Sequence, residues 1–370
     1  MTREGKLVEN VKVSKLFSRD GLNKVDDKEA FAGDIISVAG CLKAGVTDTL
    51  CASSITMPIE TKPIDPPIIS VMFQSNDSPF AGKEGKLCSS ILLKNRLMKE
   101  GDSNITLQIV PHGGEKFEIL ARGEMQIGIL IETMRREGFE FAVSSPQVLY
   151  RKGENGETLE PIEDLTVECE ETEYAVINEK LSQRKGELLN FKKLPGGKIS
   201  LSFKIPTRCL IGFRSEFISM TRGGGVMQTL LDSFQPFKGE IGNTRKGVLI
   251  SMAEGKATAY ALQPLEARGS LFITPQAPIY EGMIIGACSK EKDLEVNPCK
   301  EKHLTNMRAA GTEENIRLSP VKRMTIEDAI TYIQPDELIE VTPISIRLRK
   351  KLLTENERKK AARSSKKQFE

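Results

Sequence analysis

Tryptophan is absent from the 370-residue sequence, aromatic residues make up 5% of it, and the only two histidines, His112 and His303, lie far apart. Two distant histidines are too few for a histidine-rich metal site and leave a nucleophilic triad poorly supplied. The scarcity of aromatic rings disfavours stacking platforms for single-stranded nucleic acid. Small-molecule catalysis is therefore the weaker interpretation, and any nucleic acid would be recognised through its shape and its phosphates.

Disulfide, membrane and export signals are also missing. The seven cysteines contain no Cys-x-x-Cys spacing, which argues against a zinc knuckle or a disulfide framework and indicates a reducing compartment. No apolar run approaches the roughly 18 residues of a membrane helix. The start, Met-Thr-Arg-Glu-Gly-Lys, has no signal-peptide core. We therefore expect a cytoplasmic protein with no membrane partner, and an organelle stroma or matrix is the alternative compartment.

A nucleotide phosphate loop is the third absence, because Gly-x-x-x-x-Gly-Lys-[Ser/Thr] occurs nowhere in the sequence. The segment Gly82-Lys83-Glu84-Gly85-Lys86 is rich in glycine and lysine but has the wrong spacing. Asn23-Lys24-Val25-Asp26 has the letters of a guanine-reading tetrapeptide, and without a phosphate loop before it we interpret the match as coincidence. The chain as written is not expected to hydrolyse GTP.

The charge that is present is unevenly distributed. The whole chain has a formal net charge of +2, whereas residues 341–370 contain ten Lys and Arg and three acids and so carry +7. A basic tail behind a mildly acidic body is typical of a protein that contacts a polyanion, and a solvated, frayed terminus is the alternative. Binding through such a tail should weaken steeply with salt.

Two successive segments, residues 67–146 and 147–235, repeat one order of elements: strand, helix, strand, strand, helix, strand. Alternating apolar residues predict the strands, and apolar residues at i, i+3, i+4 and i+7 predict the helices. This order is that of ferredoxin-like domains. The predicted fold class is therefore α+β, with two ferredoxin-like modules in tandem.

The flanking segments are predicted to be rich in strands. Residues 1–62 fit a short, partial β-barrel that ends at a proline-rich linker, and residues 236–370 fit a β-rich carboxy-terminal domain with a basic tail. One helix is expected after Thr325, which can cap it. Three alternating runs predict strands in the carboxy-terminal domain: Val248-Ile250-Met252, Ala257-Ala259-Ala261 and Ile344-Ile346-Leu348.

Several motifs resemble the elongation factor G superfamily. Arg122-Gly123-Glu124-Met125-Gln126-Ile127 is similar to the Gly-Glu-Leu-His-Leu signature of its first ferredoxin-like domain, domain III. Gly212-Phe213-Arg214-Ser215-Glu216-Phe217 looks like the second-module helix, in domain V. Later motifs narrow the resemblance to the TypA/BipA ribosome-associated GTPases: Lys302-His303-Leu304-Thr305-Asn306-Met307-Arg308-Ala309, Ile346-Arg347-Leu348-Arg349-Lys350 and Leu353-Thr354-Glu355-Asn356.

The resemblance implies that this chain is the ribosome-binding part of such a GTPase, starting inside a barrel like domain II. GTP and Mg²⁺ would belong to the full-length proteins, and no cofactor is expected in this chain. The resemblance implies that the protein is a monomer. Its implied partners are large-subunit ribosomal RNA and the acceptor end of an aminoacyl-site transfer RNA. The implied role is translation under stress or ribosome assembly. Two alternatives stay open: an enzyme whose catalytic part is supplied elsewhere, and a stand-alone RNA-binding or ribosome-assembly module with no nucleotide link.

The main candidate for RNA contact is the segment 299–311. It combines cations with short polar donors and has little apolar periodicity, which suits contacts to the backbone and 2′-hydroxyls of folded RNA. Composition alone also fits an ordinary solvated loop, and the resemblance favours RNA near the peptidyl-transferase region. The candidate residues are Lys300, Lys302, His303, Thr305, Asn306 and Arg308.

A second candidate is the basic segment Arg347, Arg349, Lys350 and Lys351, which alternates in part with apolar residues. We expect these side chains on one exposed edge of a terminal strand. There they would contact ribosomal RNA, or protect the edge against aggregation.

Four further cations are candidates for a domain interface or an RNA contact: Lys83, Lys86, Arg214 and Arg222. Lys83 and Lys86 follow the first strand of the first module, where a loop could relay nucleotide state. Glu124 is expected at a helix start, where the dipole favours a carboxylate. No residue is predicted to be catalytic or to bind a metal.

Overall fold

The computed structural model describes residues 2–3, 6–21, 23–55, 57–61, 65–241, 245–301 and 317–368. The chain divides into two compact units, residues 1–65 and residues 66–370, and each is described by itself. Every helix in the described ranges is too short or too polar to cross a lipid bilayer.

The amino-terminal unit is a small β structure. β1 (Thr2–Arg3) pairs with β2 (Lys6–Leu7), and β3 (Lys15–Asp20) lies between β4 (Asn23–Asp27) and β5 (Ser37–Ala39) in an antiparallel sheet. The described strands do not close into a barrel, and no residue with a described side chain is buried. The tetrapeptide that starts at Asn23 lies in β4 and pairs along β3.

The first repeat has the predicted order of elements, and its strands lie in the order β9-β6-β8-β7. Ser89 caps the first helix, because its side chain accepts a hydrogen bond from the Ile91 N–H. That helix continues to Ser103, and the next strand begins at Gln108. The elements are β6 (Ile69–Ser75), α1 (Ser90–Ser103), β7 (Gln108–His112), β8 (Lys116–Ala121), α2 (Glu124–Arg136) and β9 (Phe141–Ser144).

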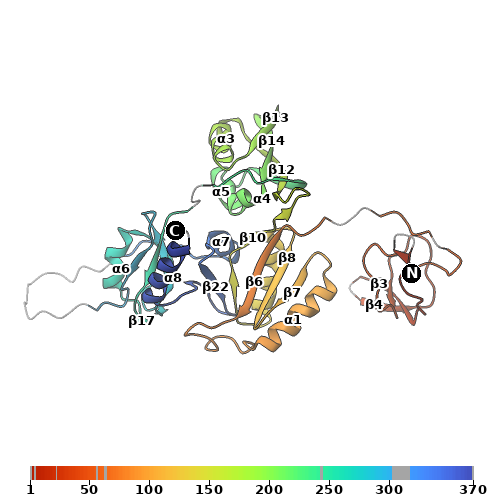
Figure 1. The fold of residues 1–370 in the computed structure, drawn as a ribbon, viewed down its shortest axis with the longest axis horizontal. Helices are drawn as coiled ribbons and strands as arrows, with labels where there is room; N and C mark the ends of the chain where they lie inside the picture. Colours follow the sequence, from red (N-terminus) through yellow and green to blue (C-terminus); the bar gives the residue numbers. More distant parts are fainter. Residues whose placement is uncertain are drawn as a thin grey trace, which may run out of the picture. The chain divides into compact units, whose positions relative to one another are not determined.

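The second repeat forms a sheet of its own, drawn in green in Figure 1, with strand order β15-β12-β14-β13. Two short strands, β10 (Gln147–Val148) and β11 (Arg151–Lys152), lead into it. The alternation from Ile199 to Ile205 buries one face of β14 against the helices. Its elements are β12 (Thr158–Glu170), the 3₁₀ turn η1 (Glu171–Glu173), α3 (Tyr174–Gln183), β13 (Glu187–Lys193), β14 (Lys198–Pro206), α4 (Thr207–Leu210), α5 (Phe213–Met220) and β15 (Val226–Pro236).

The carboxy-terminal segment mixes short strands with three helices in its described residues. Thr325 caps α7 in a capping box with Asp328, as its position predicts. The strand expected at Ala257-Ala259-Ala261 is wrong, because Thr258 caps a helix there and alanine favours helix. The elements are β16 (Val248–Ser251), β17 (Gly255–Lys256), α6 (Ala259–Glu266), β18 (Gly269–Leu271), β19 (Pro278–Ile279), β20 (Met283–Cys288), β21 (Leu294–Val296), α7 (Ile326–Tyr332), β22 (Glu337–Val341), β23 (Ile346–Lys350) and α8 (Glu355–Gln368).

The first repeat and the carboxy-terminal segment share one eleven-stranded sheet, because β22 pairs with β9. A continuous row of apolar partners crosses seven of its strands. This row binds segments that lie far apart in the sequence into one structure. In spatial order its members are Phe117, Phe73, Val143, Ile339, Leu348, Ile284 and Ile250.

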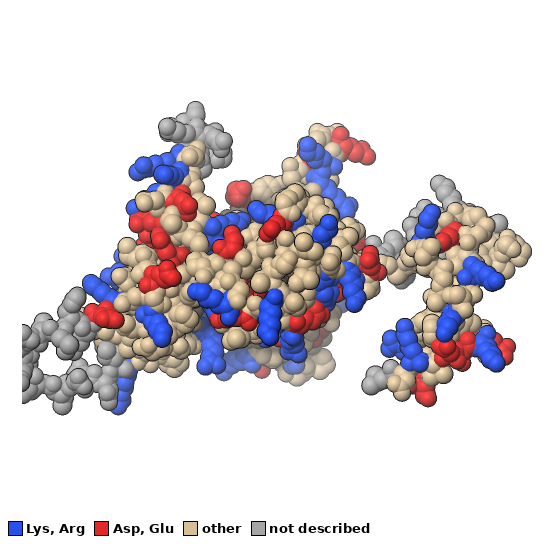
Figure 2. Space-filling view, turned by 90° about the horizontal axis from the view of Figure 1, so that it is seen from below, with Lys and Arg blue, Asp and Glu red and all other residues tan. Residues whose placement is uncertain are grey.

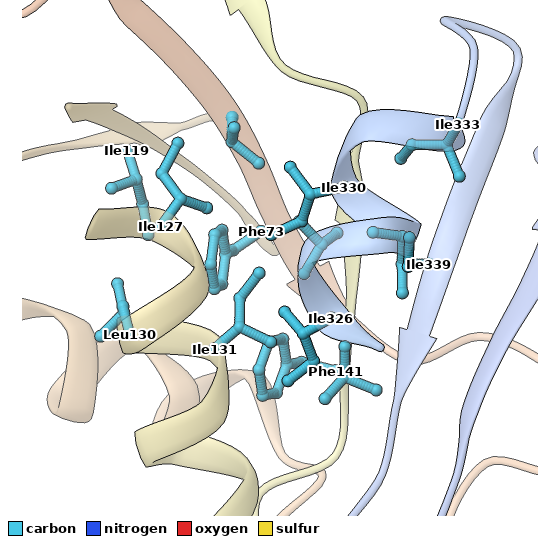
Figure 3. Packing of buried hydrophobic residues seen from close by; sticks show 14 of the residues in the cluster. Phe73, Ile119, Ile127, Leu130, Ile131, Phe141, Ile326, Ile330, Ile333 and Ile339 are labelled. Atoms are coloured by element: carbon cyan, nitrogen blue, oxygen red, sulfur yellow. The ribbon is translucent and has the colours of Figure 1, made fainter. Parts of the chain in front are cut away.

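Helices α2 and α7 cover this apolar row. In Figure 3, Ile127 and Ile131 of α2 and Ile326 and Ile330 of α7 point toward Phe73 and its neighbours. Burial of so many aliphatic and aromatic side chains stabilises the shared sheet, at roughly 1.5–3 kcal/mol for each fully buried large side chain. The core therefore joins the two segments physically.

Candidate nucleic-acid interface

The predicted RNA-binding loop starts from a fixed point. Lys300 is exposed, and its backbone carbonyl accepts a hydrogen bond from Thr258 Oγ1 (2.5 Å) at the start of α6. The first candidate residue of this segment is thereby tied to a helix cap. The other predicted loop residues lie outside the described residues: Lys302, His303, Thr305, Asn306 and Arg308.

The expectation that residues 347–351 form an exposed edge is wrong. β23 is an interior strand, paired with β20 on one side and β22 on the other. Arg347, Arg349 and Lys350 are buried, with at most 7% of each residue exposed, because both faces of the sheet are covered here. Only Lys351 is exposed, and its Nζ donates to the Pro335 carbonyl.

Glu340, which is fully buried, is the centre of a polar cluster on the face of the sheet opposite α2. Its carboxylate accepts hydrogen bonds from Tyr280 Oη (2.6 Å), Ser78 Oγ (2.9 Å), Asn76 Nδ2 (3.1 Å) and Arg347 Nη1 (3.1 Å). Burial, followed by the nearby carboxylate, raises the pKa of Tyr280 above its usual range. A buried charge needs this degree of pairing to be tolerated.

The loop after β6, which was expected to be a candidate relay, is fastened to this cluster. Glu84 forms an ion pair with Arg347 and accepts a hydrogen bond from Thr342 Oγ1 (2.6 Å). Lys83 Nζ lies 4.4 Å from the centre of the Phe80 ring, and Lys86 is exposed. The loop thus connects the first repeat to the carboxy-terminal strands.

Glu140 secures the same loop through the loop's backbone. Its carboxylate accepts hydrogen bonds from the Gly82 and Gly85 N–H groups, each at 2.9 Å, and from Asn76 Nδ2 at 2.7 Å. A Cβ atom at Gly85 would lie 2.6 Å from the Glu140 Cβ. Glycine is therefore required at this close approach.

Lys350, which is buried, is the centre of a second charged cluster. Its Nζ lies 2.7 Å from Asp293 Oδ2, 2.8 Å from Asp336 Oδ2 and 2.9 Å from Glu337 Oε1. Burial lowers the pKa of Lys350, but the three carboxylates more than offset this effect and raise it overall. These carboxylates are close enough to hold a metal ion, but they already surround an ammonium group and therefore give no evidence of a metal centre.

The second repeat places its two candidate cations differently. Arg214 of α5 is exposed, and its Nη2 donates to the Met227 carbonyl (3.3 Å). Arg222 is exposed and has a left-handed φ of 50° at the end of α5. Glu216, on the same helix, pairs with Arg184 Nη2 (2.9 Å) and with Lys180 of α3 (3.0 Å).

A hollow with a volume of about 290 Å³ lies between the repeats and is lined by two glutamates. The sequence did not single out these two residues as a pair. Glu124 begins α2 as expected, and Glu163 lies on β12. Burial is the main cause that raises the pKa of both carboxyls. Glu124 Oε2 is buried without a hydrogen-bond partner among the described residues. The sequence could not reveal this hollow, because it forms only where one repeat packs against the other.

Cations are dispersed over one face of the molecule (Figure 2). On the face drawn in Figure 2, Lys and Arg side chains alternate with Asp and Glu. That face shows no large surface of one sign among its coloured residues. On this face, attraction to a polyanion would therefore come from local groups of cations.

Comparison with known protein families identifies two parts of the chain. Residues 157–245 match the family model described as the elongation factor G C-terminus. Residues 246–355 match the model described as the TypA/BipA C-terminal domain, which covers β16 to β23 and the segment 302–316. The chain belongs to the TypA/BipA family. The match to the TypA/BipA model ends at residue 355, where α8 begins, so nearly all of α8 follows the matched region.

Relatives named "Large ribosomal subunit assembly factor BipA" match almost the whole chain. The Salmonella typhimurium protein is 43% identical over 365 residues, which is 98% of this chain and 60% of the relative. The Synechocystis protein is 42% identical over 95% of the chain and 59% of the relative. The Bacillus subtilis protein is 39% identical over 96% and 58%. The chain thus spans about 60% of the length of these BipA relatives.

Proposed function

We propose that this chain is the ribosome-binding portion of a TypA/BipA-type translational GTPase, acting in large-subunit assembly or in translation under stress. The observation that carries the proposal is the 43% identity, over 98% of the chain, to a protein named as a large-subunit assembly factor. Its partner would be the ribosome, and its compartment the cytoplasm. We propose that it acts as a monomer.

Within this function, the loop that starts at Lys300 is the proposed contact with the acceptor end of transfer RNA and with large-subunit RNA. Its support is the exposed, anchored position of Lys300 and the cations at Lys302 and Arg308. Lys83, Lys86, Arg214 and Arg222 stay proposed contacts at a domain interface or with RNA. Arg347, Arg349 and Lys350 are not proposed as RNA contacts, because each forms an ion pair with an acidic side chain of the protein.

The proposed architecture has four domains: a partial barrel (1–62), ferredoxin-like modules (67–146 and 147–235) and a family-specific domain (236–370). In each module the first strand lies between the third and the fourth, which supports a ferredoxin-like fold. GTP and Mg²⁺ belong to the GTPase family. The sequence has no phosphate loop to hold them, so we derive no hydrolytic step for this chain. A stand-alone RNA-binding or assembly module is the second candidate function.

Co-sedimentation with isolated large ribosomal subunits tests the proposal. We expect binding at low salt that weakens steeply as salt rises, and weaker binding for Lys302→Ala/Arg308→Ala. Lys290→Ala/Lys292→Ala removes two exposed cations of the same domain and is the matched control. The proposal fails if the chain does not bind, or if the loop variant and the control variant bind equally well.

Reading the gene upstream of Met1 separates the two candidate functions. A phosphate-loop motif in the same reading frame supports the GTPase portion. Translation that begins at Met1 in the cell supports the stand-alone module.

A further inference from the structure

Helix α8 is anchored at its start. It begins with a capping box, in which Thr354 Oγ1 accepts from the Glu357 N–H and Glu357 Oε2 accepts from the Thr354 N–H, each at 3.3 Å. Arg358 Nη2 donates to Glu295 Oε1 of β21 (2.9 Å), and Arg358 Nη1 donates to the Leu353 carbonyl. The helix therefore lies alongside the carboxy-terminal strands (Figure 1). The expectation of a frayed terminus does not hold for this helix start.

The positions of α8 divide into two arcs of different chemistry. Five cations follow the spacing i, i+1, i+4, i+7 and i+8, which places them within an arc of about 120° at 3.6 residues per turn. The opposite arc holds the anchor Arg358 together with Ala361, Ala362 and Ser365. The five positions of the cationic arc are Lys359, Lys360, Arg363, Lys366 and Lys367.

Part of this charge is not neutralised among the side chains that the structure describes. Lys359 pairs with Glu355 one turn earlier. Lys360 and Arg363 are exposed and form no ion pair in the described part of the chain. The cationic positions span about 12 Å along the helix axis at 1.5 Å per residue. The arc therefore offers several cations to one extended anion.

We propose that the cationic arc of α8 binds the sugar-phosphate backbone of structured RNA, as a contact additional to the loop after Lys300. The proposal rests on the proposed ribosomal function and adds a site that lies beyond the matched carboxy-terminal domain. A duplex presents closely spaced phosphates, and neutralising them releases counterions. Backbone contacts position a protein without reading bases, which suits a face rich in Lys and Arg.

The composition of α8 favours RNA over two other anionic partners. A helix that lies in a membrane surface needs a bulky apolar face, whereas residues 355–368 contain no apolar residue larger than alanine. The centre of a protein interface is enriched in aromatic residues and depleted in lysine, and α8 has the reverse composition. Phosphate binding requires only the cations that are present.

The test compares two charge-matched variants. Lys360→Gln/Arg363→Gln/Lys367→Gln removes three positions of the arc and keeps helix-favouring residues. Lys12→Gln/Lys28→Gln/Lys43→Gln removes three exposed cations of the amino-terminal unit. A third variant, Lys360→Arg/Lys367→Arg, keeps the charge. The binding partners are isolated large ribosomal subunits, a 20-base-pair RNA duplex and poly-L-glutamate, each titrated with salt.

We expect the arc variant to bind both RNA partners at least tenfold more weakly at low salt. We also expect it to reduce the slope of log Kobs against log salt by about three. The control variant and the charge-keeping variant should match the parent, and circular dichroism should show unchanged helix content. Equal losses in the arc and control variants would overturn the proposal. So would poly-L-glutamate binding as tightly as the duplex, because that would identify an acidic protein surface.

The two proposals fail in different ways. If the arc variant binds large subunits as tightly as the parent does, the proposal for the arc is wrong and the proposed ribosomal function still stands. No binding to subunits, combined with duplex binding that depends on α8, overturns the ribosomal function and supports the arc.

Discussion

Arg347 Nη1 lies 3.1 Å from Glu340 Oε1, and both side chains are buried between the shared sheet and the loop after β6. We expect Glu340→Ala to lower the free energy of unfolding by about 3–5 kcal/mol, because it leaves the guanidinium partly unpaired in the interior. Urea denaturation measures the change. Glu154→Ala, at an exposed position, is the control and should change stability by less than about 0.5 kcal/mol. An equal effect of both substitutions would contradict the role of this cluster.

Lys350 neutralises three carboxylates, and its replacement should create a site for a cation. We expect Lys350→Met to unfold at a lower temperature, with a loss of about 0.5–3 kcal/mol. Asp293 and Asp336 would lose their ammonium partner at the surface, and the buried Glu337 would keep Arg245 as an ion-pair partner. Millimolar Ca²⁺ should raise the melting temperature of the variant but not that of the parent protein. An identical calcium response in both proteins would show that the carboxylates separate when the lysine is lost.

Glu163 should make stability depend on pH. Its pKa is raised by burial in the folded protein, so the folded state holds this proton more tightly than the unfolded state does. The resulting stabilisation is complete below the unfolded pKa, near 4.3, and is lost as pH rises through the folded pKa. Glu163→Gln should therefore be more stable than the parent at pH 7, and this advantage should shrink at acidic pH.

Denaturant unfolding across pH 3–8 measures this effect. Asp164→Asn, at the exposed neighbouring position, is the control and should show no comparable pH dependence. A Glu163→Gln advantage that stays constant across the range would exclude ionisation as its cause.

The shared apolar row predicts that two distant segments unfold together. Ile339 lies on β22, between Val143 of β9 and Leu348 of β23. Ile339→Ala should cost about 2–5 kcal/mol. Hydrogen exchange should show that amides of β6 and β8 lose protection together with those of β22. Protection that falls only in the carboxy-terminal strands would show that the first repeat folds independently.

Several elements follow from local sequence alone. The run Ile199-Leu201-Phe203-Ile205 predicts β14, because alternation matches the two faces of a strand. Thr325 predicts the start of α7, because its hydroxyl satisfies a free N–H group. The alternating alanines from Ala257 fail as a strand prediction, because alanine is too small to define a buried face and the cap at Thr258 favours a helix.

The candidate sites were less predictable than the elements. The basic loop could be recognised by its composition, whereas the presence of Glu124 and Glu163 in one hollow depends on how two repeats pack. The spacing of the lysines in the sequence predicts the cationic arc of α8. Its position on the protein depends on the hydrogen bond between Arg358 and Glu295, which only the structure shows.

The sequence by itself determined the order of strands and helices in both repeats, the lack of a nucleotide phosphate loop and the concentration of positive charge near the carboxy terminus. Only the tertiary structure decided which of those charges reach solvent. The exposure of Arg347 depends on the strands beside it and on Glu84, which lies 263 positions away in the chain. Local periodicity shows which side of a strand a residue occupies, whereas long-range packing determines whether that side is covered.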